Sequence, residues 1–128
     1  VQCKSAVAPN SDKARLLMQA LTPAQRGILE GATIYEPVGC ATCGQAGYRG
    51  RTGIYEVLRV TERIEELIIR RASSADIRVR ARAEGMRTLR EQGLRKVARG
   101  DTSIAEVLEH TISDDETVSA PAGSPAHV

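Results

Sequence analysis

At residues 39–57 the chain reads Gly39-Cys40-Ala41-Thr42-Cys43-Gly44-Gln45-Ala46-Gly47-Tyr48-Arg49-Gly50-Arg51-Thr52-Gly53-Ile54-Tyr55-Glu56-Val57. Two cysteines separated by two residues lie on one tight turn, where both thiolates can face a tetrahedral metal ion while backbone N–H groups point toward the sulfurs. Five glycines within fifteen residues let the backbone bend where a Cβ would collide. The stretch therefore predicts a cysteine turn followed by a glycine-rich loop.

Two segments flanking this turn have the pattern of β-strands. Residues 33–38 precede it, and residues 52–60 follow it with Ile54, Val57 and Val60 separated by polar positions. We expect the two segments to pair as a β-hairpin that carries the cysteine turn.

The stretch resembles the cysteine motif of the secretion ATPases, the P-loop motors that drive type II secretion and type IV pilus assembly. Two further motifs of that family's helical tail follow in the same order. They read Gly85-Met86-Arg87-Thr88-Leu89 and Gly100-Asp101-Thr102-Ser103-Ile104-Ala105-Glu106-Val107. Three motifs in the right order make the resemblance specific, and it covers residues 1 to about 113.

The resemblance implies that the chain is the C-terminal part of a RecA-like P-loop ATPase. In the family a first pair, Cys-x-x-Cys-Lys, precedes the motif; Cys3 and Lys4 match its second half, which places a fourth cysteine one position before Val1. The phosphate-binding loop, the magnesium site and the catalytic carboxylate are then expected upstream. No Gly-x-x-x-x-Gly-Lys-Ser/Thr loop occurs in these 128 residues, so we expect no catalytic or nucleotide-binding residue here.

The cysteines allow three interpretations. Cys3, Cys40 and Cys43 are expected to hold a structural zinc ion, together with the cysteine implied upstream. A thioredoxin-like redox pair would need a strand-to-helix turn at the first cysteine, which the glycine-rich sequence disfavours, and two inert thiols are the third possibility. A catalytic zinc site is disfavoured because His110 and His127 are both remote from the turn in sequence.

Six residues of the motif are expected to have structural or interface roles because the resemblance implies their importance: Gly47, Tyr48, Gly50, Arg51, Gly53 and Glu56. An odd separation of five positions places Arg51 and Glu56 on opposite faces of a regular strand. We therefore expect them to contact different partners, one of them the ATPase core and the other the helical tail, with an exposed surface pair as the alternative.

Composition agrees with a small accessory domain in a reducing compartment. The 128 residues include no Phe or Trp, so the core must be aliphatic, and structural zinc would add folding free energy. An odd number of cysteines, three, argues against a disulfide framework, and no run of eighteen apolar residues appears. We expect a cytoplasmic protein.

Helical periodicity and capping signals predict an α+β, mainly α fold. Thr22-Pro23 and Thr61 are predicted helix starts, and Thr102 is predicted to cap the last helix. The expected helices are 10–21, 23–30, 62–71, 74–84, 88–99 and 102–112, with Ile64, Leu67, Ile68, Leu89, Leu94, Val97, Ile104, Val107, Leu108 and Ile112 facing inward. The expected domains are a cysteine-turn region (1–60) with a zinc-stapled hairpin, a helical subdomain (61–112) and a disordered acidic tail (113–128).

Arginine is concentrated in the second half of the chain. Thirteen arginines and one lysine lie between Arg49 and Arg99, whereas the chain ends acidic, so the net charge of +2 conceals a polarised sequence. Arg78, Arg80 and Arg82 are expected to form a solvated helix face or a subunit interface. A free-standing zinc-ribbon-like module that binds nucleic acid through its arginines is the alternative function, but the sequence lacks both aromatic residues interleaved with the arginines for stacking and a recognisable helix-turn-helix.

The predicted function is that of a C-terminal fragment of a hexameric ATPase. The resemblance implies ATP and Mg²⁺ in the intact protein, neighbouring ATPase subunits and an inner-membrane platform protein as partners, and a peripheral location at the inner membrane. No nucleic-acid partner is expected.

Overall fold

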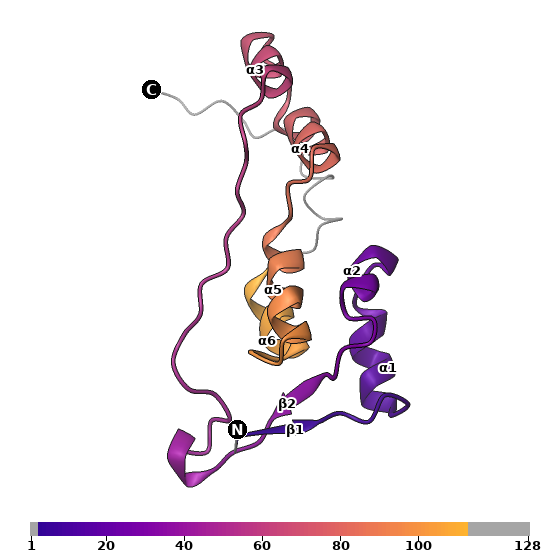
Figure 1. The fold of residues 1–128 in the computed structure, drawn as a ribbon, viewed down its shortest axis with the longest axis vertical. Helices are drawn as coiled ribbons and strands as arrows, with labels where there is room; N and C mark the ends of the chain where they lie inside the picture. The colour runs from indigo at the N-terminus through magenta and orange to yellow at the C-terminus, as the bar shows by residue number, and fades with distance from the viewer. Residues whose placement is uncertain (1–2, 113–128) are drawn as a thin grey trace, which may run out of the picture.

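The computed structural model describes residues 3–112, which form an elongated molecule (Figure 1). In chain order its elements are β1 (Lys4–Ala6), α1 (Asp12–Gln19), α2 (Pro23–Ile28), β2 (Tyr35–Pro37), the 3₁₀ turn η1 (Ala41–Cys43), α3 (Glu62–Ile69), α4 (Ser74–Ala83), α5 (Leu89–Ala98) and α6 (Ile104–His110). The described part is mainly helical with one small sheet, as the predicted fold class requires. The predicted disordered tail, residues 113–128, lies outside the described residues.

The sheet pairs β2 with the beginning of the chain. β1 and β2 are antiparallel, with Lys4 opposite Pro37 and Ala6 opposite Tyr35. The predicted strand at 33–38 is confirmed in its centre, but the predicted hairpin with residues 52–60 was wrong. The glycine-rich loop leads the chain away from β2, and the N-terminal strand occupies the pairing edge instead.

Residues 51–60, here called the strap, run extended from the cysteine turn to α3 along one side of the molecule (Figure 1). The strap has no ladder partner within residues 3–112, so the predicted strand at 52–60 was wrong. Alternation favours an extended backbone, but a strand also requires a neighbouring backbone that accepts its hydrogen bonds. Tyr55 and Val57 of the strap are each 71% exposed.

Local capping explains where the helices begin. Each of α1 to α6 starts after a Ser or Thr whose hydroxyl accepts the backbone N–H three positions on: Ser11, Thr22, Thr61, Ser73, Thr88 and Ser103. The predicted starts at Thr22 and Thr61 are confirmed, and Thr22 forms a capping box with Gln25. The predicted cap at Thr102 was wrong by one position, because the hydroxyl of Ser103 accepts the N–H of Glu106.

The main core lies between α2 and the α5–α6 pair. Its buried members are Leu21, Leu29, Leu94, Val97, Ile104 and Val107. α5 and α6 approach closely at Gly93, where a Cβ would lie 2.7 Å from Cγ1 of Val107. In and after α5 and α6, two predicted core residues were wrong: Leu89, the first residue of α5, is 38% exposed, and Ile112, beyond the end of α6, is 68% exposed.

α3 and α4 pack on each other at the end of the molecule opposite the sheet (Figure 1). Ile64 of α3 and Ala81 of α4 are buried between them, whereas Ile68, predicted to face inward, is 49% exposed. A salt bridge of 2.9 Å between Arg82 Nη2 and Glu91 Oε1 connects α4 to α5. The predicted domain boundary at residue 60 stays a prediction.

Candidate metal centre

Backbone geometry folds the cysteine turn back onto β2. Cys40 is extended, η1 follows as a single 3₁₀ turn, and Gly44 ends it in the left-handed region with a φ of 61°. Gly47 is buried against Pro37, since a Cβ at Gly47 would lie 2.5 Å from the Pro37 Cβ. Gly47 therefore has no room for a side chain, and its positive φ of 76° independently favours glycine.

The sheet brings the third cysteine to this turn. The carbonyl of Cys3 accepts the N–H of Val38 at 2.8 Å, which holds the beginning of β1 beside the chain that enters the turn. Cys3 Sγ lies 2.9 Å from Cys40 Sγ, and the Sγ atoms of Cys3, Cys40 and Cys43 all lie within 4.8 Å of one another. The structure thus gathers the three predicted ligand residues from two segments of the chain.

Cys3 and Cys43 differ in acidity because their hydrogen bonds differ. The backbone N–H groups of Cys40 and Gly47 both donate to Cys43 Sγ at 3.2 Å. These bonds favour a thiolate and lower the pKa of Cys43 from 9.0 to about 7. The hydrogen bond with the Cys40 thiol, together with burial, raises the pKa of Cys3 to about 12. Of these two thiols, Cys43 is the one that ionises first.

The donor set fits a soft tetrahedral ion. Zinc binds thiolates at about 2.3 Å, so two sulfurs on one tetrahedral zinc lie about 3.8 Å apart. Cys3 Sγ and Cys40 Sγ lie 2.9 Å apart and all three Sγ atoms lie within 4.8 Å of one another, so the sulfur separations bracket this value. The redox interpretation is disfavoured, because η1 has only three residues and no α-helix begins at Cys40.

Two residues beside the cysteines reach the helical part of the molecule. Lys4, next to Cys3, donates from Nζ to the carbonyl of Gly100 at 2.7 Å and lies 4.2 Å from the ring centroid of Tyr35. The Tyr48 hydroxyl lies 2.5 Å from Oγ of Ser103, the N-cap of α6. The cysteine turn and β1 therefore hold both the end of α5 and the beginning of α6.

The other motif residues lie along the strap. Glu56 Oε2 accepts the N–H of Leu89 at 3.2 Å, so Glu56 contacts the N-terminus of α5, while its predicted interface role stays a prediction. Arg51 is exposed and lines an open groove together with Cys3 and Tyr48. The predicted role of Arg51 toward another part of the protein stays a prediction, as do the interface roles of Gly50 and Gly53.

Sequence reasoning missed two residues that organise this region. Ser103 serves as both helix cap and partner of Tyr48, and only the three-residue spacing to Glu106 signals the cap. Arg90 is 7% exposed and donates from Nε and Nη2 to the side chain and carbonyl of Thr111 at 3.0 and 2.5 Å. Its spacing of four and seven positions from Leu94 and Val97 placed it on the buried face of α5.

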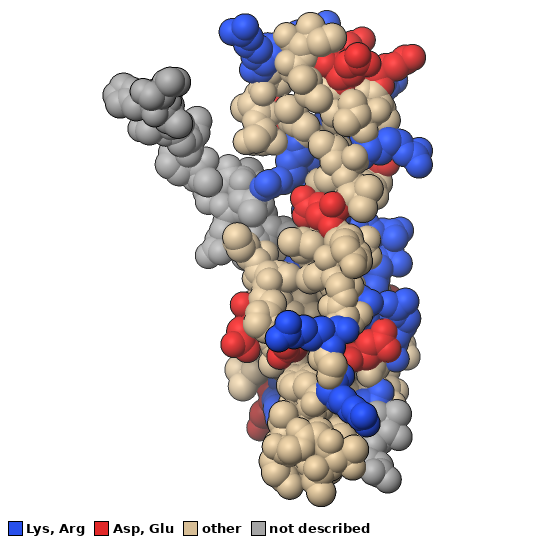
Figure 2. Space-filling view, turned by 90° about the vertical axis from the view of Figure 1, so that its left-hand side faces the viewer, with Lys and Arg blue, Asp and Glu red and all other residues tan. Residues whose placement is uncertain are grey.

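Charged residues on the strap side of the molecule are mixed rather than uniformly basic. Figure 2 shows Lys and Arg interspersed with Asp and Glu on this face, while the end that carries the cysteine turn is largely uncharged. On α4, Arg80 pairs with Glu84 at 2.6 Å, and Arg82 pairs with Glu91, as noted above. His110 is exposed on α6 beside Glu106 and is not a member of the sulfur cluster.

The matches to known proteins extend across nearly the whole described region. A family model described as Type II/IV secretion system protein matches residues 3–109. The type IV pilus assembly ATPase PilB of Thermus thermophilus is 41% identical over 110 residues, which are 86% of this chain and 12% of that protein. Type II secretion system protein HxcR of Pseudomonas aeruginosa is 43% identical over 77 residues, 60% of this chain and 16% of HxcR. Type II secretion system protein E of Dickeya dadantii is 39% identical over 87 residues, which are 68% of this chain and 17% of that protein.

The chain therefore spans less than a fifth of the length of these relatives. Among the described residues, no helix combines the length and the apolar character needed to cross a bilayer.

Proposed function

Because this chain belongs to the type II/IV secretion system protein family, we propose that it is the C-terminal part of a hexameric ATPase that powers type II secretion or type IV pilus assembly. The observation that carries the proposal is the match at 41% identity over 110 residues to a type IV pilus assembly ATPase, which covers 86% of this chain. ATP and Mg²⁺ would bind the intact protein outside these residues, since the chain contains no phosphate-binding loop.

Within that machine, the cysteine-turn region would be a zinc-stapled structural unit. Strands of three residues give little stability by themselves, and a metal bound by Cys3, Cys40 and Cys43 would fix β1 against the turn. Zinc supplies a structural cross-link when bound. A further cysteine upstream, as in the family motif, would complete the tetrahedral set.

The consequence of such a cross-link reaches beyond the sheet. Fixing Cys3 also fixes Lys4 at the C-terminal end of α5, and fixing the turn also fixes Tyr48 at the N-terminal end of α6. We infer that the metal holds the α5–α6 pair in position relative to the strap and the cysteine turn. The partners would be neighbouring ATPase subunits and an inner-membrane platform protein, at the cytoplasmic face of that membrane.

Metal analysis tests the structural role. The protein, extended upstream through the expected cysteine, should hold about one zinc per chain, and Cys40→Ser with Cys43→Ser should remove it. Thr42→Ala is the matched control, because Thr42 is exposed in the same turn but offers no thiol. Stoichiometric zinc in the double cysteine variant would exclude this site.

Nucleotide and nucleic-acid binding test the motor assignment. The intact protein should hydrolyse ATP, whereas the 128-residue chain should show no saturable ATP binding tighter than about 1 mM. Arg51→Ala in the intact protein should reduce turnover or hexamer stability and leave the zinc content unchanged. Tight salt-dependent nucleic-acid binding by the chain, with an unaffected Arg51→Ala motor, would favour the alternative nucleic-acid module.

A further inference from the structure

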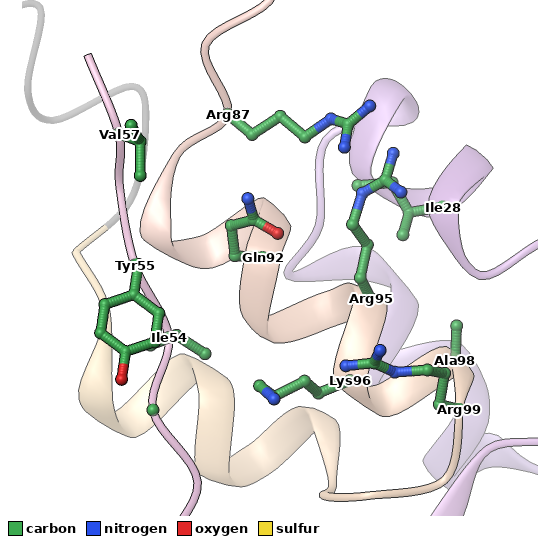
Figure 3. A pocket seen from close by; sticks show the side chains of 11 residues that line it. Ile28, Ile54, Tyr55, Val57, Arg87, Gln92, Arg95, Lys96, Ala98 and Arg99 are labelled. Carbon is green, nitrogen blue, oxygen red and sulfur yellow. The ribbon is translucent and has the colours of Figure 1, made fainter. Parts of the chain in front are cut away.

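A groove separate from the cysteine cluster lies between the strap and α5. It has a volume of about 620 Å³, and its walls come from Ile54, Tyr55 and Val57 of the strap, from α5 and from Ile28 of α2. Figure 3 shows Lys96 directed from α5 toward the strap, while Arg87 and Arg95 extend toward Ile28. Arg99 adds a fourth cation, and among residues 3–112 no Asp or Glu lines the groove.

Several basic residues in and around this groove already have a carboxylate partner. Arg80 and Arg82 each pair with a carboxylate, and Arg99 at the rim pairs with Asp101 at 3.3 Å. By contrast, the side chains of Arg87, Arg95 and Lys96 have no ion pair or hydrogen bond with any residue from 3 to 112. Three cations without a partner among residues 3–112, beside apolar walls, are complementary to an acidic segment that also carries apolar side chains.

Three consecutive acidic residues follow α6 in the sequence, whereas the carboxylates of Glu56, Glu91 and Asp101 near the groove already have partners within the described residues. Asp114, Asp115 and Glu116 come three to five positions after Thr111. The carbonyl of Thr111 is held by Arg90 in the first turn of α5, three positions after Arg87, which lines the groove. At about 3.3–3.6 Å per residue, five residues span up to roughly 18 Å, enough to pass one turn of α5.

We propose that the acidic segment 114–116 of this same chain binds the groove, with its carboxylates on Arg87, Arg95 and Lys96. The charges are complementary: residues 3–112 carry a net charge of +5, because all 18 basic residues but only 13 of the 16 acidic residues lie there. A tethered segment also has a high effective concentration at a nearby site, so a few ion pairs suffice for binding.

The test measures how fast Lys96 is acetylated by N-hydroxysuccinimidyl acetate in the 128-residue chain, followed by mass spectrometry. Neutralising the segment with Asp114→Asn, Asp115→Asn and Glu116→Gln should raise the Lys96 rate severalfold in low salt, while exposed Lys13 reacts unchanged. The difference should disappear in about 0.5 M salt, where exposed charges are screened within a few ångströms. A synthetic peptide of residues 112–119, added to the neutralised variant, should restore protection.

A charge-matched control separates binding from a general field effect. Glu62→Gln, Glu65→Gln and Glu66→Gln remove the same charge from exposed positions of α3 and should leave the Lys96 rate unchanged. Equal Lys96 rates with the native and neutralised segments would overturn the proposal. Protection that appears only as the protein concentration rises would also overturn it, because the segment would then come from a second copy.

Discussion

The bond between Tyr48 and Ser103 joins the cysteine-turn region to α6, and its removal has a calculable cost. Ser103 is 5% exposed, and its hydroxyl both accepts the N–H of Glu106 and meets the Tyr48 hydroxyl at 2.5 Å. Ser103→Ala therefore removes a helix cap, worth about 1 kcal/mol, and leaves a half-buried Tyr48 hydroxyl without this partner, worth about 1 kcal/mol more. We expect a total loss of about 2 kcal/mol, or roughly 8–12 °C in Tm.

A double-mutant cycle isolates the contribution of the hydrogen bond. The free energy of unfolding is measured by urea titration, followed by far-UV circular dichroism, for the native chain, Tyr48→Phe, Ser103→Ala and the double variant, all with zinc and reductant. The coupling energy should be about 1 kcal/mol. Because Tyr48→Phe keeps the ring, the change removes only the hydroxyl.

Ser11→Ala provides the matched control. Ser11 caps α1, which packs on the same core, and it accepts the N–H of Ala14 at 3.1 Å without contacting a tyrosine. Its replacement should cost about 1 kcal/mol, half of the loss at Ser103. A coupling energy near zero, or equal losses at Ser11 and Ser103, would refute the view that Tyr48 anchors the cysteine turn to α6.

Three further predictions follow from individual contacts. Gly93→Ala should lower stability by about 1 kcal/mol in urea titrations, since overpacking against Val107 outweighs the gain of about 1 kcal/mol in helix propensity; increased stability would contradict the close approach of α5 and α6. In the metal-free chain, iodoacetamide should label Cys43 first, and its rate should rise as the pH increases from 6 to 8 through the pKa of about 7, because only the thiolate reacts; a rate that rises only near pH 9 would contradict the lowered pKa. Glu56→Gln should lower the free energy of unfolding by about 0.5 kcal/mol, because a negative charge at the N-terminus of α5 is lost, and salt should reduce the difference; an equal difference at high salt would contradict this account.

Sequence reasoning succeeded where the determining interactions are local. Helix starts at Thr22 and Thr61 were predictable because the cap and its backbone donor are three positions apart. The error at Thr102 arose because two adjacent hydroxyls both fit the pattern. The choice of Ser103 brings its hydroxyl to Tyr48, 55 positions earlier in the sequence.

The candidate site was predictable as a set of residues but not as an arrangement. Cys40 and Cys43 are fixed relative to each other by a short turn, so their proximity follows from spacing. The position of Cys3 depends on the pairing of β1 with β2 across two helices, and periodicity alone assigned that pairing to residues 52–60. The same pairing positions Lys4 to donate from Nζ to the carbonyl of Gly100.

The sequence by itself determined the cysteine turn, the helix caps and the family, because each depends on residue types at fixed short spacings. The tertiary structure alone decided which segment completes the sheet, that the strap stays unpaired within residues 3–112, and that Arg90 is buried against Thr111. These outcomes depend on competition between distant segments for the same hydrogen-bonding edge or buried face. Because a strand or a helix face presents similar groups to any partner, its pattern specifies that a contact is needed and leaves the choice of partner to packing.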